Sequence, residues 1–355
     1  MGRAPGRSSG GLRRGSGGAM VPAMARRPRP VLVTGASGFV GRAVVPALRA
    51  AGHPVRATAR RPRGPDPRVE WVEADLTRPS SLPRALEGVG TALFLVHGMA
   101  SAREDYAEEE RRAAATFTRE AERAGVERIV YLGGVRPRGR PSKHLASRLA
   151  VGEVLRGGRV PALELRASMI VGAGSASWQV VRDLALRLPA MVLPSWAESR
   201  TCPVAIDDVV AALVAAVDVP LRASGFADLP GPEVLSMREI LTRVAALRGR
   251  SLPTFRTPLP APRVSAVWLK LVSDADWKVV RELVQGLEHD LLPQDGASFW
   301  NAIGPRTLIP FDEAARRALA EDRPGHGLRG MLHGLGERIV QAVGPRRREA
   351  SGNAS

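Results

Sequence analysis

The chain has 355 residues, 44% of them hydrophobic, which is enough for a full α/β core with one smaller lobe beside it. Its single cysteine, Cys202, excludes an internal disulfide and a CxxC zinc site, and fits a reducing compartment. No uninterrupted apolar run reaches the ~18 residues of a membrane-spanning helix, so we expect a cytoplasmic protein without a transmembrane segment.

The net charge of +17 is unevenly distributed along the chain. Residues 1–29 contain seven arginines and no acid, and their Gly/Ser/Arg composition predicts a disordered basic leader. A weak nucleic-acid or membrane-surface tether is the alternative for this leader. Residues 344–355 are predicted to be a disordered tail. The body lacks an aromatic and basic pattern, so no specific nucleic-acid partner is expected.

From residue 30 onward, short β-rich runs alternate with helical ones. Strands are predicted at 30–34, 54–58, 68–75, 91–97, 126–134 and 161–172. Helices are predicted at 39–52, 103–125, 142–157, 205–218 and 231–249. Strands as apolar as these are typical of a sheet covered on both faces. Residues 30–172 are therefore predicted to form a Rossmann-type domain, an α/β fold with a doubly wound parallel sheet.

Beyond Gly172 strands become sparser and proline more frequent. We expect residues 173–343 to form a smaller, mainly helical C-terminal lobe for a substrate or partner, with elements that complete the Rossmann sheet. Residues 251–343 are predicted to be mainly amphipathic helix. The helix predicted at 327–344 is apolar on one face, which favours docking on the body, on a protein partner or in a homo-oligomer.

Two helix starts carry capping signals. Asp207 or Asp208 is expected to cap the first turn of the helix at 205–218. Ser236, followed three residues later by Glu239, predicts a capping box.

The stretch "TGASGFVG" (34–41) places three glycines between a strand and a helix. In that context the first glycine permits a tight turn, the second a close approach to a pyrophosphate, and the third close packing of helix on strand. The following helix N-terminus offers N–H groups to the phosphates. A tight turn without a ligand is the alternative. The expected cofactor contacts in this stretch are Gly35, Ser37, Gly38, Phe39, Val40 and Gly41.

The end of the second strand indicates which dinucleotide binds. The stretch "TARRP" offers Arg60 and Arg61 where an NAD-binding protein usually carries a carboxylate for the ribose 2′-hydroxyl. Arginine pairs well with a 2′-phosphate, so NADP(H) is preferred and NAD(H) remains an alternative. Both arginines could instead reflect the arginine-rich composition.

Three further residues follow strand ends near the expected cofactor. Asp75, with Leu76 beside it, could accept a hydrogen bond from the adenine amino group or cap the next turn. His97 ends the run at 91–97, at the carboxyl edge where open α/β sheets bind ligands, so it is either a cofactor or substrate contact or a structural residue.

The stretches "VLVTGASGFVG", "ADL", "IVYLGG" and "LRASMIVGAGS", in this order, carry a family resemblance. Residues 30–250 resemble the short-chain dehydrogenase/reductase superfamily in its extended and atypical branch. Within that branch, the chain is similar to bacterial NAD(P)H-binding proteins related to NmrA-like regulators and to the nucleotide-binding accessory subunit of respiratory complex I. The last hundred residues match less distinctly.

This resemblance implies a Ser-Tyr-Lys catalytic group, which the chain lacks. The serine position falls at Gly133 or Gly134, the tyrosine position at His144 and the lysine position at Arg148. Histidine, with an ordinary pKa of about 6.5, can donate a proton at physiological pH. Arg148 could still hydrogen-bond a ribose. The alternative is that His144 is a half-buried helix residue beside the cofactor.

Two other segments are expected near the reaction site. Arg166 is expected to face the same crevice, where it could orient an acidic substrate or bond backbone carbonyls. The segment "GAGSASW" (172–178) resembles the loop that closes over nicotinamide in extended members, with an ordinary polar turn as the alternative.

Two functions therefore remain open. The first is an NADPH-dependent reductase of a small or quinone-like carbonyl compound. The second is a non-catalytic NADP(H)-binding sensor or assembly protein. Outside the predicted disordered leader, the sequence contains no GxSxG elbow, and it has no HExxH or other metal-ligand spacing, which argues against a serine hydrolase and a metal enzyme.

Overall fold

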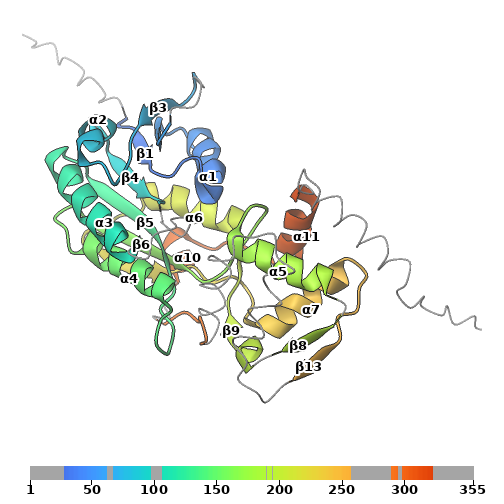
Figure 1. Ribbon diagram of the computed structural model, residues 1–355. Helices are drawn as coiled ribbons and strands as arrows, with labels where there is room; N and C mark the ends of the chain where they lie inside the picture. The colour runs from blue at the N-terminus through green and yellow to red at the C-terminus, as the bar shows by residue number, and fades with distance from the viewer. Residues whose placement is uncertain are drawn as a thin grey trace, which may run out of the picture.

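The computed structural model describes residues 28–61, 67–96, 106–188, 190–193, 195–256, 289–294 and 298–322. Five predictions concern residues wholly or mostly outside these ranges: the basic leader apart from its last two residues, His97, the amphipathic helices at 251–343, the helix at 327–344 and the tail. Figure 1 shows a sheet flanked by helices, and beside it a smaller group that includes α5, α7, α11, β8 and β13.

A sheet of seven parallel strands forms the centre of the larger part. In spatial order the strands are β11-β6-β5-β4-β1-β2-β3. Their bounds are β1 Val31–Val33, β2 Val55–Ala59, β3 Glu70–Glu73, β4 Thr91–Phe94, β5 Arg128–Gly134, β6 Ala162–Ala167 and β11 Gly225–Asp228. The predicted doubly wound Rossmann sheet is confirmed.

Helices cover both faces of the sheet. Neighbouring residues in a strand point to opposite faces, and here both sets of side chains are apolar, so each face needs a covering layer. On one face Val33 and Leu93 belong to a core that packs against α1 (Phe39–Ala50) and α6 (Ile206–Asp218). On the other face Leu32 and Phe94 pack towards three helices. Those helices are α2 (Leu82–Leu86), which follows the short 3₁₀ turn η1 (Pro79–Ser81), α3 (Tyr106–Arg123) and α4 (Lys143–Arg156).

The smaller part has its own apolar core, in which Trp178, Ile240 and Phe311 are buried. Its helices are α5 (Ala176–Arg187), α7 (Met237–Leu247) and α11 (Phe311–Glu321), and α10 (Phe299–Ile303) packs near α6. Short strands pair as β7 (Ile170–Val171) with β10 (Val204–Ala205), β9 (Arg200–Thr201) with β12 (Leu235–Ser236), and β8 (Met191–Leu193) with β13 (Thr254–Arg256); η2 (Ser195–Glu198) is a short 3₁₀ turn.

Several predicted boundaries were wrong. The strand predicted at 161–172 is interrupted at Ser168 and Met169, because β7 leaves the main sheet to pair with β10. The helix predicted at 231–249 begins only at Met237, since β12 precedes it. The predicted capping box is confirmed: the Ser236 side chain accepts from Glu239 N, and the Glu239 carboxylate accepts from Ser236 N at 2.7 Å.

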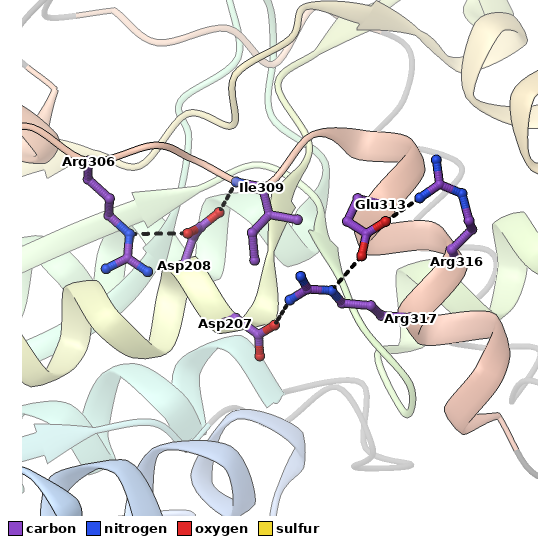
Figure 2. Close-up of polar contacts among 7 residues, drawn as sticks. All are labelled: Asp207, Asp208, Arg306, Ile309, Glu313, Arg316 and Arg317. Carbon is purple, nitrogen blue, oxygen red and sulfur yellow. Dashed lines mark hydrogen bonds and ion pairs between the residues drawn. The ribbon is translucent and has the colours of Figure 1, made fainter.

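The expected cap of α6 by an aspartate was wrong. Ala205 occupies the N-cap position without a side-chain cap, and both aspartates reach instead to the C-terminal segment (Figure 2). The fully buried Asp208 accepts from Ile309 N at 2.9 Å and from Arg306 Nε at 3.2 Å. Asp207 pairs with Arg317 at 2.9 Å. These contacts fasten α11 and the segment before it to the Rossmann helix α6.

The two aspartates should differ sharply in their contribution to stability. Asp208→Ala removes the acceptor of Ile309 N–H and should lower the free energy of unfolding by about 2–3 kcal/mol, measured by urea denaturation. Asp207→Ala, which breaks a half-exposed pair, should change it little. Asp208→Asn keeps one acceptor and should fall in between. Equal losses for the two alanine variants would contradict this role of Asp208.

Candidate cofactor and substrate site

The crevice of the sheet opens where the chain leaves β1 and β4. Thr34 links the ends of the two strands: its N donates to Leu93 O at 3.0 Å, and its Oγ1 accepts from Leu95 N at 3.0 Å. Connections from β1 and β4 run to opposite sides of the sheet, which makes this edge the usual ligand position in open α/β sheets. Gly35, in the left-handed region with φ of 66°, makes the turn that enters the crevice.

The start of α1 lies against this turn. A Cβ on Gly41 would lie 2.3 Å from the carbonyl oxygen of Gly35, so only glycine allows the helix to approach this closely. The helix begins after Gly38, and no side chain caps it. Its first N–H groups are therefore left for a ligand, as binding of a dinucleotide phosphate requires.

A cavity of about 970 Å³ extends from this glycine loop to the smaller lobe. Its wall includes the ends of the parallel strands, the first turns of α3 and α4, one side of α5, Met237 and Leu291. This volume is at the upper end of the range of about 300–1,000 Å³ that is typical of small-molecule sites. The cavity joins the expected cofactor position to a second region within the smaller lobe.

Most residues predicted to form the site line this cavity. They are Gly35, Ser37, Gly38, Phe39, Val40, Gly41, Arg60, Asp75, Leu76, His144 and Arg148. Arg61 is exposed and is not part of the lining, although its neighbour Arg60 is.

Asp75 makes the turn contact that was one of its two predicted roles. Its Oδ1 accepts from Thr77 N at 2.9 Å and from Thr77 Oγ1 at 2.7 Å. Partial burial alone would raise the pKa of Asp75, but the bonds from Thr77 and the charges of Arg78 and Arg60 bring this pKa below its ordinary value. Asp75 therefore stays ionised in the cavity wall as a hydrogen-bond acceptor.

His144 and Arg148 lie on α4, beside the end of β5. His144 is half-buried in the first turn, which begins where the Ser142 side chain accepts from Leu145 N at 3.3 Å. Arg148 Nη2 donates to the carbonyl of Leu132, and the carbonyl of Arg148 accepts from Tyr131 OH at 3.1 Å. Arg148 thus ties α4 to β5 as well as lining the cavity.

Tyr131 does not replace the tyrosine that is absent at position 144. It is buried in the sheet, where loss of solvation raises its pKa to about 12. Its hydroxyl is bonded to helix α4, and it is not part of the cavity lining. Tyr106 at the start of α3 does line the cavity.

The position of the absent serine is occupied by another side chain. A Cβ on Gly133 would lie 2.6 Å from Oε1 of the buried Glu164, whereas the nearest atom to a Cβ on Gly134 would be the end of the Leu145 side chain, at 2.7 Å. Glu164 is held by Arg156 at 2.9 Å and by Arg166 at 3.2 Å.

The prediction that Arg166 faces the crevice was wrong. Arg166 and Glu164 project from β6 towards α4, while Leu165 between them packs on the opposite face. The Arg166 guanidinium lies 3.6 Å from the centre of the Phe226 ring and does not line the cavity. The predicted nicotinamide loop at 172–178 was also misplaced in part, because α5 begins at Ala176.

Sequence analysis missed the contributions of α3 and α5. Glu109 and Glu110 line the cavity, and Glu110 accepts from Ser147 Oγ of α4. The spacing of Tyr106, Glu110 and the apolar residues Ala114 and Phe117 on one stripe of α3 was the signal that could have found Glu110.

Neither a metal site nor a membrane span is found in the described part of the chain. There, no three His, Cys, Asp or Glu side chains gather closely enough to hold a metal ion. None of the helices described is both long enough and apolar enough to cross a membrane.

The fold and this cavity define a dinucleotide-binding α/β protein. A family model described as NAD(P)H-binding matches residues 35–182, the part of the chain that contains the glycine loop. This match and the fold are consistent with the resemblance of the sequence to the atypical short-chain dehydrogenase/reductase superfamily. A ceramide reductase of Caulobacter vibrioides is 33% identical over 203 residues, which is 54% of this chain. The match spans only 62% of the length of that relative.

Solved structures support the same fold. The triphenylmethane reductase of Citrobacter sp., complexed with NADP(H), matches with a TM-score of 0.65 at 18% identity, over 81% of this chain and 99% of that one. A nucleoside-diphosphate-sugar epimerase of Staphylococcus aureus matches with a TM-score of 0.64 at 14% identity, over 81% and 99%. At these identities the likeness concerns the fold.

The two glycines at the serine position should respond differently to substitution. Gly133→Ser should displace the buried Glu164 and lower the free energy of unfolding by about 1–3 kcal/mol. Gly134→Ser should be tolerated, because the end of the Leu145 side chain can move. Thermal unfolding of both variants beside the parent protein measures this difference. A Gly133→Ser protein as stable as Gly134→Ser would contradict the role assigned to Glu164.

Proposed function

We propose that this protein is an NADP(H)-dependent reductase of an apolar carbonyl compound. The observation that carries the proposal is the single cavity, which joins the glycine loop and Arg60 to an apolar region beside His144. The Caulobacter relative, named for reduction of ceramide, supports a reductase whose substrate carries long aliphatic chains. A quinone-like carbonyl compound also fits an apolar region.

The region of the cavity beyond the sheet is built from aliphatic and thioether side chains. Val180, Val181 and Leu184 of α5 contribute to it, with Met169 and Met237. Burial of an aliphatic chain against such a wall contributes roughly 25 cal/mol per Å² of apolar surface. A hydrophobic substrate would therefore gain binding energy here that a small polar metabolite would not.

The residues of the glycine loop fit a dinucleotide, and NADPH supplies a hydride to the carbonyl carbon when bound. The protein must then provide a proton to the carbonyl oxygen. His144 takes this role in our proposal, because it lines the cavity from the first turn of α4, where the family places its tyrosine. The product is the corresponding alcohol.

The preference for NADP(H) rests on Arg60. It follows β2 directly and lines the cavity, whereas Arg61 faces solvent. A guanidinium at this place suits a 2′-phosphate on the adenosine ribose. Asp75, the acceptor on the neighbouring turn, is proposed to bind the adenine amino group as well as its turn.

A non-catalytic NADP(H) sensor is the second candidate. It is favoured by the absence of the Ser-Tyr-Lys group and by the bond that holds Arg148 to the backbone of Leu132. In a sensor the cavity would still bind NADPH, but no carbonyl compound would cause its oxidation.

Arg60 should set the choice of cofactor. Arg60→Ala should weaken NADPH binding about 10-fold to 100-fold and leave NADH binding nearly unchanged, because a charge-assisted bond to phosphate is lost. Calorimetric titration with both nucleotides measures this. Arg61→Ala is the matched control and should change neither affinity much. Equal weakening of NADPH by the two variants, or of both nucleotides by Arg60→Ala, would argue against a phosphate contact specific to Arg60.

His144 separates the two candidate functions. Absorbance of reduced nicotinamide is followed while the NADPH complex is incubated with long-chain ketones, aldehydes and quinones. His144→Phe should lower kcat about 100-fold or more and keep NADPH affinity, because only the proton donor is removed. His144→Gln, which keeps a polar group, should lose nearly as much. Turnover that survives both substitutions would exclude His144 as the donor, and tight NADPH binding without any turnover would favour the sensor.

A further inference from the structure

Thr201 is a polar residue in the wall of the cavity, next to the apolar residue Leu291. It ends β9, and its backbone lies between two neighbours, with Leu235 of β12 on one side and a bridge to Leu291 on the other. The residue is only 4% exposed and lines the cavity. Leu291 itself also lines the cavity, as does Met237, which follows Leu235 by two residues in the chain.

The hydroxyl of Thr201 has no hydrogen-bond partner among the described residues. Leaving a buried hydroxyl unsatisfied is unfavourable, and such groups in folded proteins are rarely without a partner. Ser168, which lines the same cavity, offers a contrast, since its Oγ donates to Cys202 O at 2.8 Å. Valine would fill the same space without the cost of an unsatisfied buried hydroxyl. We therefore expect a ligand to supply the hydrogen-bond partner of Thr201.

The position of Thr201 indicates which part of a ligand it would meet. Ser168 directly follows β6, and its hydroxyl donates to the carbonyl of Cys202, the residue after Thr201. This bond holds Cys202 next to the end of β6. That strand end also belongs to the cavity wall, close to β5 and the start of α4. A group bonded to Thr201 would therefore lie near the reacting carbonyl and not at the far end of an aliphatic chain.

We propose that Thr201 forms a polar subsite that binds a neutral hydroxyl or amide group close to the carbonyl of an otherwise aliphatic substrate. This inference rests on the proposed reductase function and narrows its substrate class to amphiphiles with two neighbouring polar groups. A hydroxyl can donate one hydrogen bond and accept two, so it suits either group. An ionised group would be costly beside Leu291 and Met237, where apolar side chains surround it.

The subsite is tested with methyl decyl ketone and a series of its hydroxyl derivatives, in which the hydroxyl is moved one carbon at a time along the decyl chain. With the parent protein, a derivative carrying the hydroxyl near the carbonyl should exceed the plain ketone in kcat/KM by about 10-fold to 100-fold. Thr201→Val should abolish this preference, because kcat/KM for the hydroxyl derivative should fall to that of the plain ketone. Thr201→Ser, which keeps the hydroxyl, should retain the preference.

Affinity and stability provide readouts that do not depend on turnover. Calorimetric titration of the NADP⁺ complex with the same ketones should show the same preference and its loss in Thr201→Val. The melting temperature of Thr201→Val should be equal to or above that of the parent protein, because an unsatisfied hydroxyl is removed. Thr201→Ala is the second variant, should the valine disturb folding, and should lose the preference too.

The outcomes separate this inference from the proposed function. If no ketone is reduced but the NADP⁺ complex prefers one hydroxyl derivative through Thr201, the reductase fails and the subsite stands. If ketones are reduced without any preference among the derivatives, or Thr201→Val keeps that preference, the subsite is overturned. It is also overturned if Thr201→Val weakens NADPH binding, because the hydroxyl would then serve the cofactor.

Discussion

The approach of Gly41 to the carbonyl of Gly35 is the contact on which the site depends. With any side chain at position 41, α1 could not begin so close to the turn after β1, since the added carbon would lie 2.3 Å from a backbone oxygen. This contact aims the uncapped N-terminus of α1 at the crevice between β1 and β4. The cofactor end of the cavity is thus a property of backbone geometry.

The other end of the cavity depends on how the C-terminal segment returns to the Rossmann part. Asp208, buried at the start of α6, holds the backbone of Ile309 (Figure 2), and α11 then packs on α7. Since α7 and α5 share one core, this fastening also fixes the apolar wall that Val181 and Leu184 present to the cavity. A buried polar contact outside the cavity lining therefore supports the proposed substrate region.

The rearranged catalytic position has a structural basis. The catalytic serine of related reductases needs space beside β5, and here the carboxylate of Glu164 occupies that space at Gly133. Two arginines, Arg156 and Arg166, neutralise this buried acid, and the ring of Phe226 lies over both. On α4, Arg148 donates to the carbonyl of Leu132 in β5, at the position where related reductases carry a lysine that reaches a ribose. If the protein is a reductase, all three members of the catalytic group have been replaced, rather than one of them.

The sequence by itself determined the sheet, the glycine loop and most of the cofactor wall. These are local features: apolar runs set the strands, and the spacing of Gly35, Gly38 and Gly41 fits only a strand, turn and helix in succession. Only the tertiary structure decided that Arg166 turns away from the crevice, that Asp208 holds a distant segment, and that Thr201 lines the cavity. Those outcomes depend on which face of a strand or helix meets a neighbour remote in sequence, and local pattern carries no information about that neighbour.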